Sequence, residues 1–481
     1  MDAEVVGSGP NGMAAAVILA RAGLTVRVYE LSESIGGSAG TNVGSLGEGV
    51  LSDAGSAVHP MAVASPFFKA FELASRVKFF TPEISYAHPV EHGRAGIAFH
   101  DLGETAASLG REGKAWRRAF APLVHHIDAV SEVTSGTLFS LARRPDVAAR
   151  IGLRFAAQVL QAPSSRESSV TAAMLAGLHA HSIATLPSLG AAAVGLVLGA
   201  HAHARGWPIP KGGSQSIITA MADDLIEHGG SLEVGHRISN VRELSAPIKI
   251  LDVSPTQFRA MDDALPPGYR ARLARFRYGG AASKVDFLLS EPVPWRNADV
   301  ARAGTVHVGG NWADIARGER QLRRGIMTER PYVLVSQPSL FDESRAPDSN
   351  HVLWSYTHAP AHSNVDMTEV VTRQIEHYAP GFRDVIVASV ATTSEGIARQ
   401  NVNHVGGDFA TGAVTLDQLL ARPTLSLTPW RTPSTGVYLC SAGTSPGPGV
   451  HGMAGYHAAR LALKDVHGVL ELPDLGIHRS A

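Results

Sequence analysis

Cysteine is nearly absent from this sequence. Cys440 is the only cysteine among 481 residues, so no internal disulfide can form and a reducing compartment is expected. A single thiol also rules out a C-x-x-C redox pair. A true disulfide reductase is therefore excluded by cysteine count alone.

Charge and long apolar runs are scarce as well. Charged residues make up 18% of the chain and the net charge is −1, which gives no electrostatic basis for binding nucleic acid. The longest apolar run, residues 189–200, is shorter than the ~20 residues of a membrane-spanning helix and predicts a buried or substrate-facing helix. No basic stretch precedes the first apolar residues, so we expect no signal peptide and a cytoplasmic location. Peripheral contact with a membrane stays open.

Glycine, by contrast, is abundant, and one cluster marks a nucleotide site near the N-terminus. An apolar strand over 4–6 runs into Gly7, Gly9 and Gly12 at G-x-G-x-x-G spacing, and an alanine-rich helix leads to a second strand over 25–30. This order is typical of dinucleotide binding, with the pyrophosphate at the helix N-terminus. Glu30 ends the second strand, where its carboxylate would accept hydrogen bonds from ribose hydroxyls.

A second glycine-rich loop lies near the C-terminus. A strand pattern over 436–440 runs into a loop over 441–450, and a helix of small residues follows directly. Each motif alone is ambiguous, because glycine turns also serve simple chain reversal. Together they predict the two halves of one cofactor site.

The segments around both loops resemble the FAD-binding amine-oxidase and phytoene-desaturase superfamily. The similarity includes the pair Gly36-Gly37, the segment 207–214, and G-T-x-P-G-x-G-V-x-G over 443–452. Stretches such as 283–286 and 450–453 resemble the phytoene-desaturase-like branch that contains the pyridine nucleotide-disulphide oxidoreductase domain proteins. The resemblance covers essentially the whole chain and is more specific for cofactor and fold than for substrate.

This resemblance implies an α/β fold with two interleaved domains. A discontinuous Rossmann-type FAD-binding domain of the glutathione-reductase kind would comprise residues 1–70, 205–262 and 428–481. An α+β substrate or cap domain would comprise 71–204 and 263–427, with the ligand bound between the two domains.

Local patterns give the expected elements of the cap. Its first part should be mostly helical, with apolar periodicity over 116–141 and 147–160. Its second part should hold a mixed sheet, with strands over 282–289, 332–337 and 351–358. Only residues 242–250 separate the expected adenine segment from a strand at 251–255 that would close the FAD domain, so the small middle sheet of relatives should be trimmed.

Non-covalent FAD is the cofactor that the resemblance implies. Many relatives have an arginine after the second glycine pair, and Ser38 stands in its place here, so that contact is lost or supplied elsewhere. By resemblance the backbone at Ile238 holds the adenine, and the C-terminal loop passes under the flavin ring. The expected cofactor contacts are Gly7, Gly9, Pro10, Asn11, Gly12, Glu30, Gly36, Gly37, Ser38, Ile238, Gly443, Thr444, Gly449, Val450 and Met453.

Three residues are candidates for proton transfer. Lys284 lies on a strand resembling one that, in amine oxidases of this superfamily, carries a lysine near flavin N5, where it holds a water. His59 and His451 follow segments that relatives place beside the ring, and either could be a general base. The alternatives are a surface lysine and structural histidines. Glu395 and Asn401 are weaker candidates on a cap segment.

No metal site is expected. The pairs His179/His181 and His201/His203 are spaced i, i+2, which does not bring both side chains to one face of a helix. No cysteine or carboxylate cluster completes either pair.

The predicted function is an FAD-dependent dehydrogenase or desaturase. Flavin N5 would take a hydride from a hydrophobic, lipid-like or polyene-like substrate, a nearby base would take the proton, and oxygen or a quinone would reoxidise the flavin. The alternatives are an amine oxidase of the same fold, a flavin-dependent isomerase and a non-catalytic flavoprotein that serves as a binding partner. Aromatic residues at 6% of the chain argue against the aromatic cage of an amine oxidase. Substrate identity and oligomeric state stay open.

Overall fold

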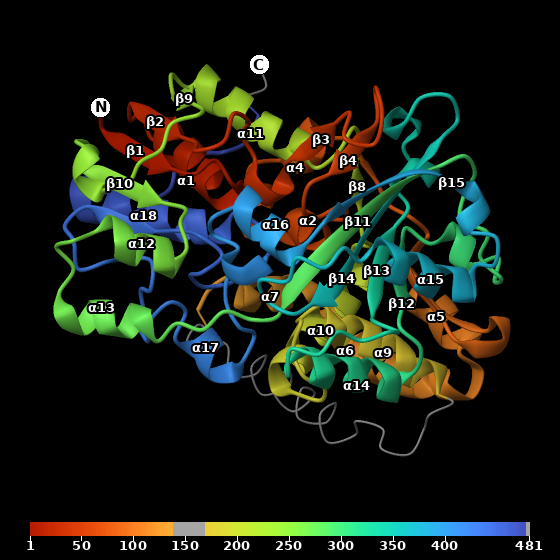
Figure 1. Cartoon of the computed structure of the whole chain (residues 1–481). Helices are drawn as coiled ribbons and strands as arrows, with labels where there is room; N and C mark the ends of the chain where they lie inside the picture. The colour runs from red at the N-terminus through yellow and green to blue at the C-terminus, as the bar shows by residue number, and fades with distance from the viewer. Residues whose placement is uncertain (138–168, 478–481) are drawn as a thin grey trace.

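The computed structural model describes residues 1–137 and 169–477, which build two large sheets (Figure 1). The first has five parallel strands in the order β16-β10-β1-β2-β9. An all-parallel sheet with helical crossovers is the doubly wound arrangement expected from the sequence. Its strands are β1 (Ala3–Val6), β2 (Val26–Tyr29), β9 (Ser231–Glu233), β10 (Ile248–Leu251) and β16 (Val437–Leu439).

Three helices pack beside this sheet, and small residues allow them to pack closely. α1 (Pro10–Arg21) crosses from β1 to β2 and contacts both α11 (Gln215–Glu227) and α18 (Met453–His467). A Cβ on Gly455 of α18 would lie 1.9 Å from the Asn11 carbonyl oxygen of α1, so only glycine fits there. The helix after the first glycine motif and the helix after the last one are therefore direct neighbours.

The expected position of one strand in this sheet is wrong. β10 ends at Leu251 and lies between β1 and β16, so the edge is formed by β16 and not by a strand at 251–255. Residues from Pro255 onward turn into α12 (Pro255–Met261), because proline favours the first turn of a helix. The trimmed connection before β10 is confirmed, since the 3-10 turn η5 (Val241–Glu243) is the regular element there.

The second sheet has seven strands in the order β15-β11-β14-β13-β12-β6-β7. All its neighbouring pairs are antiparallel except β12 with β6. Both parts of the expected cap contribute to it. The described part of residues 71–204 is mostly helical, as predicted, but it also supplies β6 and β7, which were not predicted from the sequence. The strands are β6 (Ile84–Pro89), β7 (Ala95–Phe99), β11 (Ala281–Leu289), β12 (Thr305–Val308), β13 (Val333–Ser336), β14 (His351–Ala359) and β15 (Ile386–Thr392).

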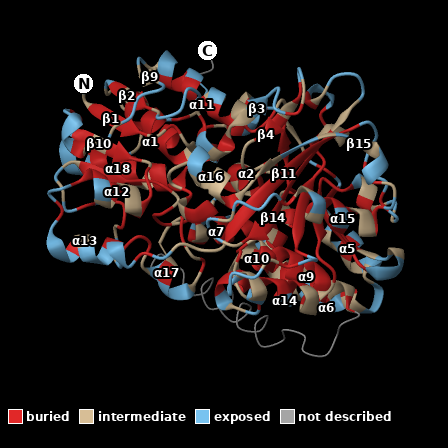
Figure 2. Cartoon of the chain, in the orientation of Figure 1, coloured by how far each residue is buried: buried red, intermediate tan, exposed pale blue. Residues whose placement is uncertain are grey.

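Alternation along these strands gives the sheet two distinct faces. One face packs on helix α15 (Thr368–Tyr378), and we call it the aliphatic face; it carries Val285, Phe287, Leu353, Val333, Val335, Val306 and Val308. The other packs on α9 (Val170–Ala180) and α14 (Trp312–Leu322), and we call it the histidine face; it carries Lys284, Trp354, Tyr356, His358, Leu334, His307, Tyr86 and His88. Figure 2 shows the central strands buried between these layers.

Of the remaining helices, α13 packs with α12 against the first sheet, and the others surround the second sheet or link the two sheets. The apolar run at 189–200 lies within α10 (Leu189–Ala204), a largely buried helix, as predicted. The helical pattern from 116 appears as α6 and α7, whereas the pattern over 147–160 lies outside the described residues. The helices are α2 (Pro60–Ala64), α3 (Pro66–Ala70), α4 (Leu73–Arg76), α5 (Leu102–Ser108), α6 (Gly113–His125), α7 (Ile127–Thr134), α13 (Pro267–Ala274), α16 (Ser394–Gln400) and α17 (Leu416–Leu420).

Two strand pairs complete the described chain. β3 (Thr41–Val43) pairs with β4 (Leu51–Asp53), and β5 (Phe79–Phe80) pairs with β8 (Ile209–Pro210). Across residues 1–137 and 169–477, we find no helix whose length and apolar composition would let it cross a membrane.

Candidate functional site

The N-terminal glycine turn has the close packing that a cofactor loop requires. Gly7 adopts φ +97°, and a Cβ on Gly12 would lie 2.0 Å from the Gly7 carbonyl oxygen. Neither position tolerates a side chain. Gly9 is the N-cap of α1 and supplies no side-chain cap, and Pro10 opens the helix. The first amides of α1 are thus directed at the end of the sheet, where a phosphate would bind.

Glu30 lies beside this turn, as the sequence predicts. Its carboxylate accepts hydrogen bonds from the Ser8 amide at 2.9 Å and the Ser8 hydroxyl at 2.6 Å, and from the Ser32 amide at 2.9 Å. The Ser8 hydroxyl in turn accepts from the Gly36 amide at 3.1 Å. One short network therefore joins the glycine turn, the acid and the second glycine pair.

The second glycine pair contacts the first motif directly. Gly36 and Gly37 have φ +121° and +55°, and a Cβ on Gly37 would lie 3.5 Å from the Gly9 Cα. Ser38, which replaces an arginine of relatives, bonds through its hydroxyl to His404 Nε2 at 3.0 Å. Burial lowers the pKa of His404 to about 4, so this histidine is neutral near pH 7.

The C-terminal loop meets the N-terminal turn through Asn11. The side-chain oxygen of Asn11 accepts from the Ala454 amide at 3.2 Å, at the start of α18. Within the loop, the Thr444 hydroxyl donates to the Ser441 carbonyl at 2.7 Å, and Gly449, at φ +137°, lies against α2 near Met61. The two motifs at opposite ends of the chain thus lie together, and Val450 and Met453 pack on the core beneath them.

Cys440 and Ile238 occupy supporting positions. Cys440 is fully buried after β16, and burial raises its thiol pKa well above the usual value, which makes it inert at neutral pH. Ile238 packs against the cluster that contains Val6 and Tyr29, beside the end of β2. Its role in holding the adenine stays a prediction.

Sequence reasoning missed three polar residues around these loops. Asn403 accepts from the Ser254 amide at 2.6 Å and donates to the Asp252 carbonyl at 3.2 Å, which ties the segment after α16 to the first sheet. Asp252 itself accepts from the Gly12 amide at 3.0 Å. Arg422 is fully buried, where burial lowers its pKa to about 10, and it donates to carbonyls of both its own segment and the C-terminal loop. No local motif marks any of the three, because each acts through partners distant in sequence.

Lys284 is buried on the histidine face, which confirms the predicted burial. Its side chain is 10% exposed, its ammonium pairs with Asp286, and the Asp286 carboxylate also accepts from the Ser52 hydroxyl at 2.5 Å. Burial raises the pKa of Asp286, and the nearby ammonium opposes that rise. The Lys284 ammonium also lies 5.9 Å from the Trp354 ring centre. Its role beside the flavin stays a prediction.

The two candidate histidines differ in what their ring nitrogens contact. His59 bonds through Nε2 to the Ser214 hydroxyl at 2.7 Å, whereas its buried Nδ1 has no partner. His451 bonds through Nε2 to the Gly447 carbonyl at 3.2 Å and through Nδ1 to the Met453 amide at 3.0 Å. Burial lowers the pKa of both to about 4. His451 therefore braces the C-terminal loop, and of the two only His59 retains a ring nitrogen without a partner.

The histidine face also carries an unforeseen dyad of carboxylate and imidazole. His358 Nδ1 bonds to Glu319 Oε1 of α14 at 2.5 Å, and both side chains are buried. His358 Nε2 is buried without a partner. The Glu319 contact at Nδ1 orients the imidazole ring and leaves Nε2 as the ring nitrogen without a partner.

Further imidazole and aromatic rings extend from this dyad across the face. His181 and His307 meet through their Nε2 atoms at 2.9 Å. Tyr86 stacks on His307 with ring centres 4.9 Å apart, and its buried hydroxyl has no partner. The face therefore offers several unpaired hydrogen-bonding atoms in an aromatic surround.

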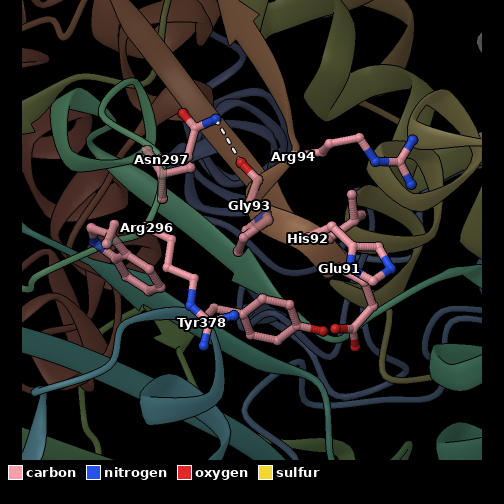
Figure 3. A pocket seen from close by; sticks show the side chains of 11 residues that line it. Glu91, His92, Gly93, Arg94, Arg296, Asn297 and Tyr378 are labelled. Carbon is pink, nitrogen blue, oxygen red and sulfur yellow. Dashed lines mark hydrogen bonds between the residues drawn. The ribbon is translucent and has the colours of Figure 1, made fainter.

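An open hollow of about 280 Å³ lies elsewhere, at the turn between β6 and β7 (Figure 3). Glu91, Arg94 and Arg296 surround it with exposed side chains, and Asn297 donates to the Gly93 carbonyl at 3.1 Å. None of the predicted cofactor or catalytic residues lines this hollow. It is a surface depression of the second sheet and not the predicted cofactor site.

The histidine pairs named above do not assemble a metal site in the described chain. One group with metal-like spacing is found there, Asp224, Glu227 and His228 at the end of α11. Asp224 is already paired with Arg21 at 2.5 Å and Arg76 at 3.2 Å. These contacts neutralise the group as an ion-pair cluster.

Comparison with known proteins identifies the class of the chain. The family model described as flavin containing amine oxidoreductase matches residues 11–463. A rat protein, pyridine nucleotide-disulfide oxidoreductase domain-containing protein 2, is 24% identical over 97% of this chain and 94% of its own length. A redesigned putrescine oxidase is 16% identical over 97% of this chain and 99% of its own, with a TM-score of 0.61. A reduced UDP-galactopyranose mutase, 12% identical over 98% and 95%, has a TM-score of 0.57.

The predicted cofactor, FAD, and the predicted fold class are confirmed by these comparisons. The residues present also fit a dinucleotide, because the glycine cradle would be filled by any Cβ and α1 begins at the end of the sheet with no side-chain cap from its N-cap residue. Gly7, Gly9, Gly12 and Glu30 would hold its pyrophosphate and ribose end. The C-terminal loop around Gly449 would approach the flavin end.

Proposed function

We propose a reaction for this chain from the premise that it belongs to the family of flavin-containing amine oxidoreductases. The chain is an FAD-dependent oxidoreductase, and its proposed activity is dehydrogenation of a carbon skeleton. Bound FAD supplies the acceptor for a hydride from one carbon. Side chains of the histidine face bind the substrate and accept the proton lost from its neighbouring atom.

The observation that carries this proposal is the chemistry of the histidine face. Its aromatic rings give an apolar surround, yet four buried polar atoms in it lack partners: Tyr86 Oη, His88 Nδ1, His307 Nδ1 and His358 Nε2. Buried polar groups are normally satisfied, so unsatisfied ones need an explanation such as a ligand or water. We infer a substrate with a hydrophobic body and at least one hydrogen-bonding group.

Two groups on this face are suited to proton transfer. Lys284 can hold a water through its ammonium, which Asp286 keeps in place. His358 has a free Nε2, and Glu319 fixes its opposite nitrogen. Both lie on adjacent strands, since Lys284 pairs with Tyr356 and Ala282 with His358. Substrate bound across β11 and β14 could therefore reach either group.

An anaerobic bleaching screen tests the proposed function. Purified yellow protein is mixed without oxygen with lipid, polyene, amine and hydroxy-acid pools, and the flavin absorbance is followed. Bleaching by a lipid or polyene pool is the expected result. Photoreduction provides the control that the ring is competent. A photoreducible flavin that no pool bleaches would contradict the dehydrogenase and favour the isomerase or the non-catalytic binding protein.

Amine oxidation is the second candidate, and one contact favours it. Trp354 and Tyr356 stand edge to face with ring centres 5.5 Å apart, next to Lys284. Aromatic faces bind cationic or freshly neutralised amines well. The similarity to a putrescine oxidase supports testing this class. Bleaching by the amine pool with oxygen-dependent peroxide release would select it over the desaturase.

A further inference from the structure

Asp252 places a carboxylate at the N-terminus of α1, inside the glycine cradle. Its Oδ2 accepts from the Gly12 amide at 3.0 Å. A Cβ on Gly9 would lie 2.8 Å from the same oxygen, and one on Gly7 would lie 3.1 Å from the Asp252 Cβ. Asp252 thus lies against all three glycines of the fingerprint, with its carboxylate beside Gly9 and Gly12. It occupies the helix terminus where a dinucleotide pyrophosphate belongs.

The surroundings of Asp252 supply no positive side chain. Among residues 1–137 and 169–477, no lysine, arginine or histidine forms an ion pair with it. Glu30, directly after β2, disfavours a negative charge on Asp252, and Asp252 in turn raises the pKa of the Cys440 thiol after β16. The segment after α16 contributes the neutral amide of Asn403, while its histidine, His404, bonds to Ser38 instead. Burial, opposed in part by the Gly12 amide, raises the pKa of Asp252 to about 7.

The backbone of Asp252 is also held in place beside the site. Asn403 bonds to its carbonyl oxygen at 3.2 Å, and the Asp252 amide donates to the Val6 carbonyl at 2.8 Å. The residue is therefore fixed at the junction of β10 and the α1 terminus. An incoming pyrophosphate and an ionised Asp252 would bring like charges together in a poorly solvated site.

We propose that FAD binds to this protein together with one proton, which resides on the Asp252 carboxyl group. The neutral carboxylic acid keeps one oxygen as acceptor for the Gly12 amide and turns its O–H toward the phosphates. Charge repulsion is replaced by a hydrogen bond to an anion, which is a strong class of hydrogen bond. The bound cofactor keeps its full charge, and the proton comes from solvent.

Linkage fixes the expected pH dependence. Below pH ~7 the carboxyl group already carries its proton, and FAD affinity should be constant. Above that pH each binding event must take up a proton, so the apparent Kd should rise about tenfold per pH unit. Proton uptake should approach about one per FAD at high pH and fall toward zero at low pH.

The test uses apoprotein prepared from the holoenzyme and FAD itself as the probe. Flavin fluorescence gives Kd from pH 5.5 to 9, and calorimetry in two buffers of different ionisation enthalpy gives the protons taken up by the wild type. Asp252→Asn, which keeps an acceptor for Gly12 and adds an N–H donor, should bind as tightly at pH 9 as the wild type at pH 5.5. Glu30→Gln, the matched control, should weaken binding at every pH while keeping the slope.

If the wild type took up no proton on binding FAD at high pH, this measurement alone would overturn the proposal. An unchanged pH slope in Asp252→Asn would overturn it as well. Failure of the wild type to bind FAD at every pH would instead contradict the cofactor assignment, and so the two failures can be told apart.

Discussion

The two faces of the seven-stranded sheet are both buried but differ completely in chemistry. On the aliphatic face Val285, Phe287 and Leu353 pack on α15. Their neighbours on the same strands, Lys284, Asp286 and Trp354, point to the histidine face. Burial alone therefore does not separate the two faces; the kind of side chain and the unpartnered polar atoms do.

The difference has an energetic meaning. Apolar burial on the aliphatic face contributes about 25 cal/mol for each Å² removed from water, at no polar cost. On the histidine face, unpartnered nitrogens and hydroxyls each cost roughly 1–3 kcal/mol of desolvation. Such a cost is expected at a site that binds something else, and it is the basis for the following tests of the comparison.

The largest expected effect is acid lability that comes from the histidine face. Burial lowers the pKa of His88 to about 4 and of His181 to about 3, and that of His307 well below its usual 6.5. These groups stay neutral in the folded protein, so their stability contribution is present above pH ~6.5 and is lost as pH falls toward 4. Each should remove about 1.4 kcal/mol per pH unit below ~6.5.

Urea unfolding at pH 7.5 and pH 5 measures this effect. His88→Gln keeps a donor for the Gly310 carbonyl and cannot take up a proton. Between pH 7.5 and pH 5 the wild type should therefore lose about 2 kcal/mol more of its free energy of unfolding than this variant. The residues of the aliphatic face carry no titratable group, so Val335→Ala should lower stability equally at both pH values. If His88→Gln and the wild type lost the same free energy of unfolding between the two pH values, the histidine face would not be the source of the acid lability.

A substitution on the aliphatic face should give the next largest effect. Phe287 is fully buried and meets Phe382 edge to face with ring centres 5.4 Å apart. Phe287→Ala should lower the free energy of unfolding by about 3–5 kcal/mol, because it leaves a cavity in a packed layer. Tyr356→Phe, the matched change on the histidine face, should cost about 1 kcal/mol or less. Equal losses in urea midpoints would show that both faces are merely structural.

Lys284→Met should lower stability and have a large effect on flavin reduction. Asp286 keeps the Ser52 hydroxyl but loses its buried ammonium partner, so we expect the free energy of unfolding to fall by about 3 kcal/mol. Flavin reduction by the active pool should slow by about 10²-fold or more, as for loss of a proton-transfer group. Stopped-flow bleaching measures the rate.

Asp286→Asn is the control for Lys284→Met, because it keeps the ammonium. It should retain most of the flavin reduction rate and a normal FAD spectrum. If Lys284→Met and the wild type reduced the flavin at equal rates, Lys284 would be only a structural residue of the histidine face.

Local patterns in the sequence were enough to predict the cofactor loops and several elements of both sheets. The helix expected after the first glycine motif is α1 (Pro10–Arg21), and the strands expected at 282–289 and 351–358 are β11 and β14. These segments have strong periodicity, so the pattern fixes them regardless of their neighbours. β6 and β7 were missed because strands rich in small residues and histidine carry a weak pattern of their own, and pairing with β12 decides them.

Site residues divide in the same way. Gly7, Gly12 and Gly36 could be identified by spacing, because the positive φ of Gly7 and Gly36 and the close contact of Gly12 with the Gly7 carbonyl are local properties. Asp252, Asn403 and the dyad of His358 and Glu319 could not, because their meaning depends on partners up to 240 residues away. His451 was a reasonable candidate base by position, yet its two ring nitrogens bond to the backbone of its own loop.

The sequence by itself determined the cofactor and the fold class of this protein. Glycine spacing, strand and helix periodicity and the final acid of β2 are short-range features, and they specify a dinucleotide crevice wherever the chain folds. Only the tertiary structure decided which face of the second sheet carries unpartnered polar atoms and which carboxylate lies at the α1 terminus. Those outcomes depend on desolvation and on contacts between distant strands, which residue order alone does not encode.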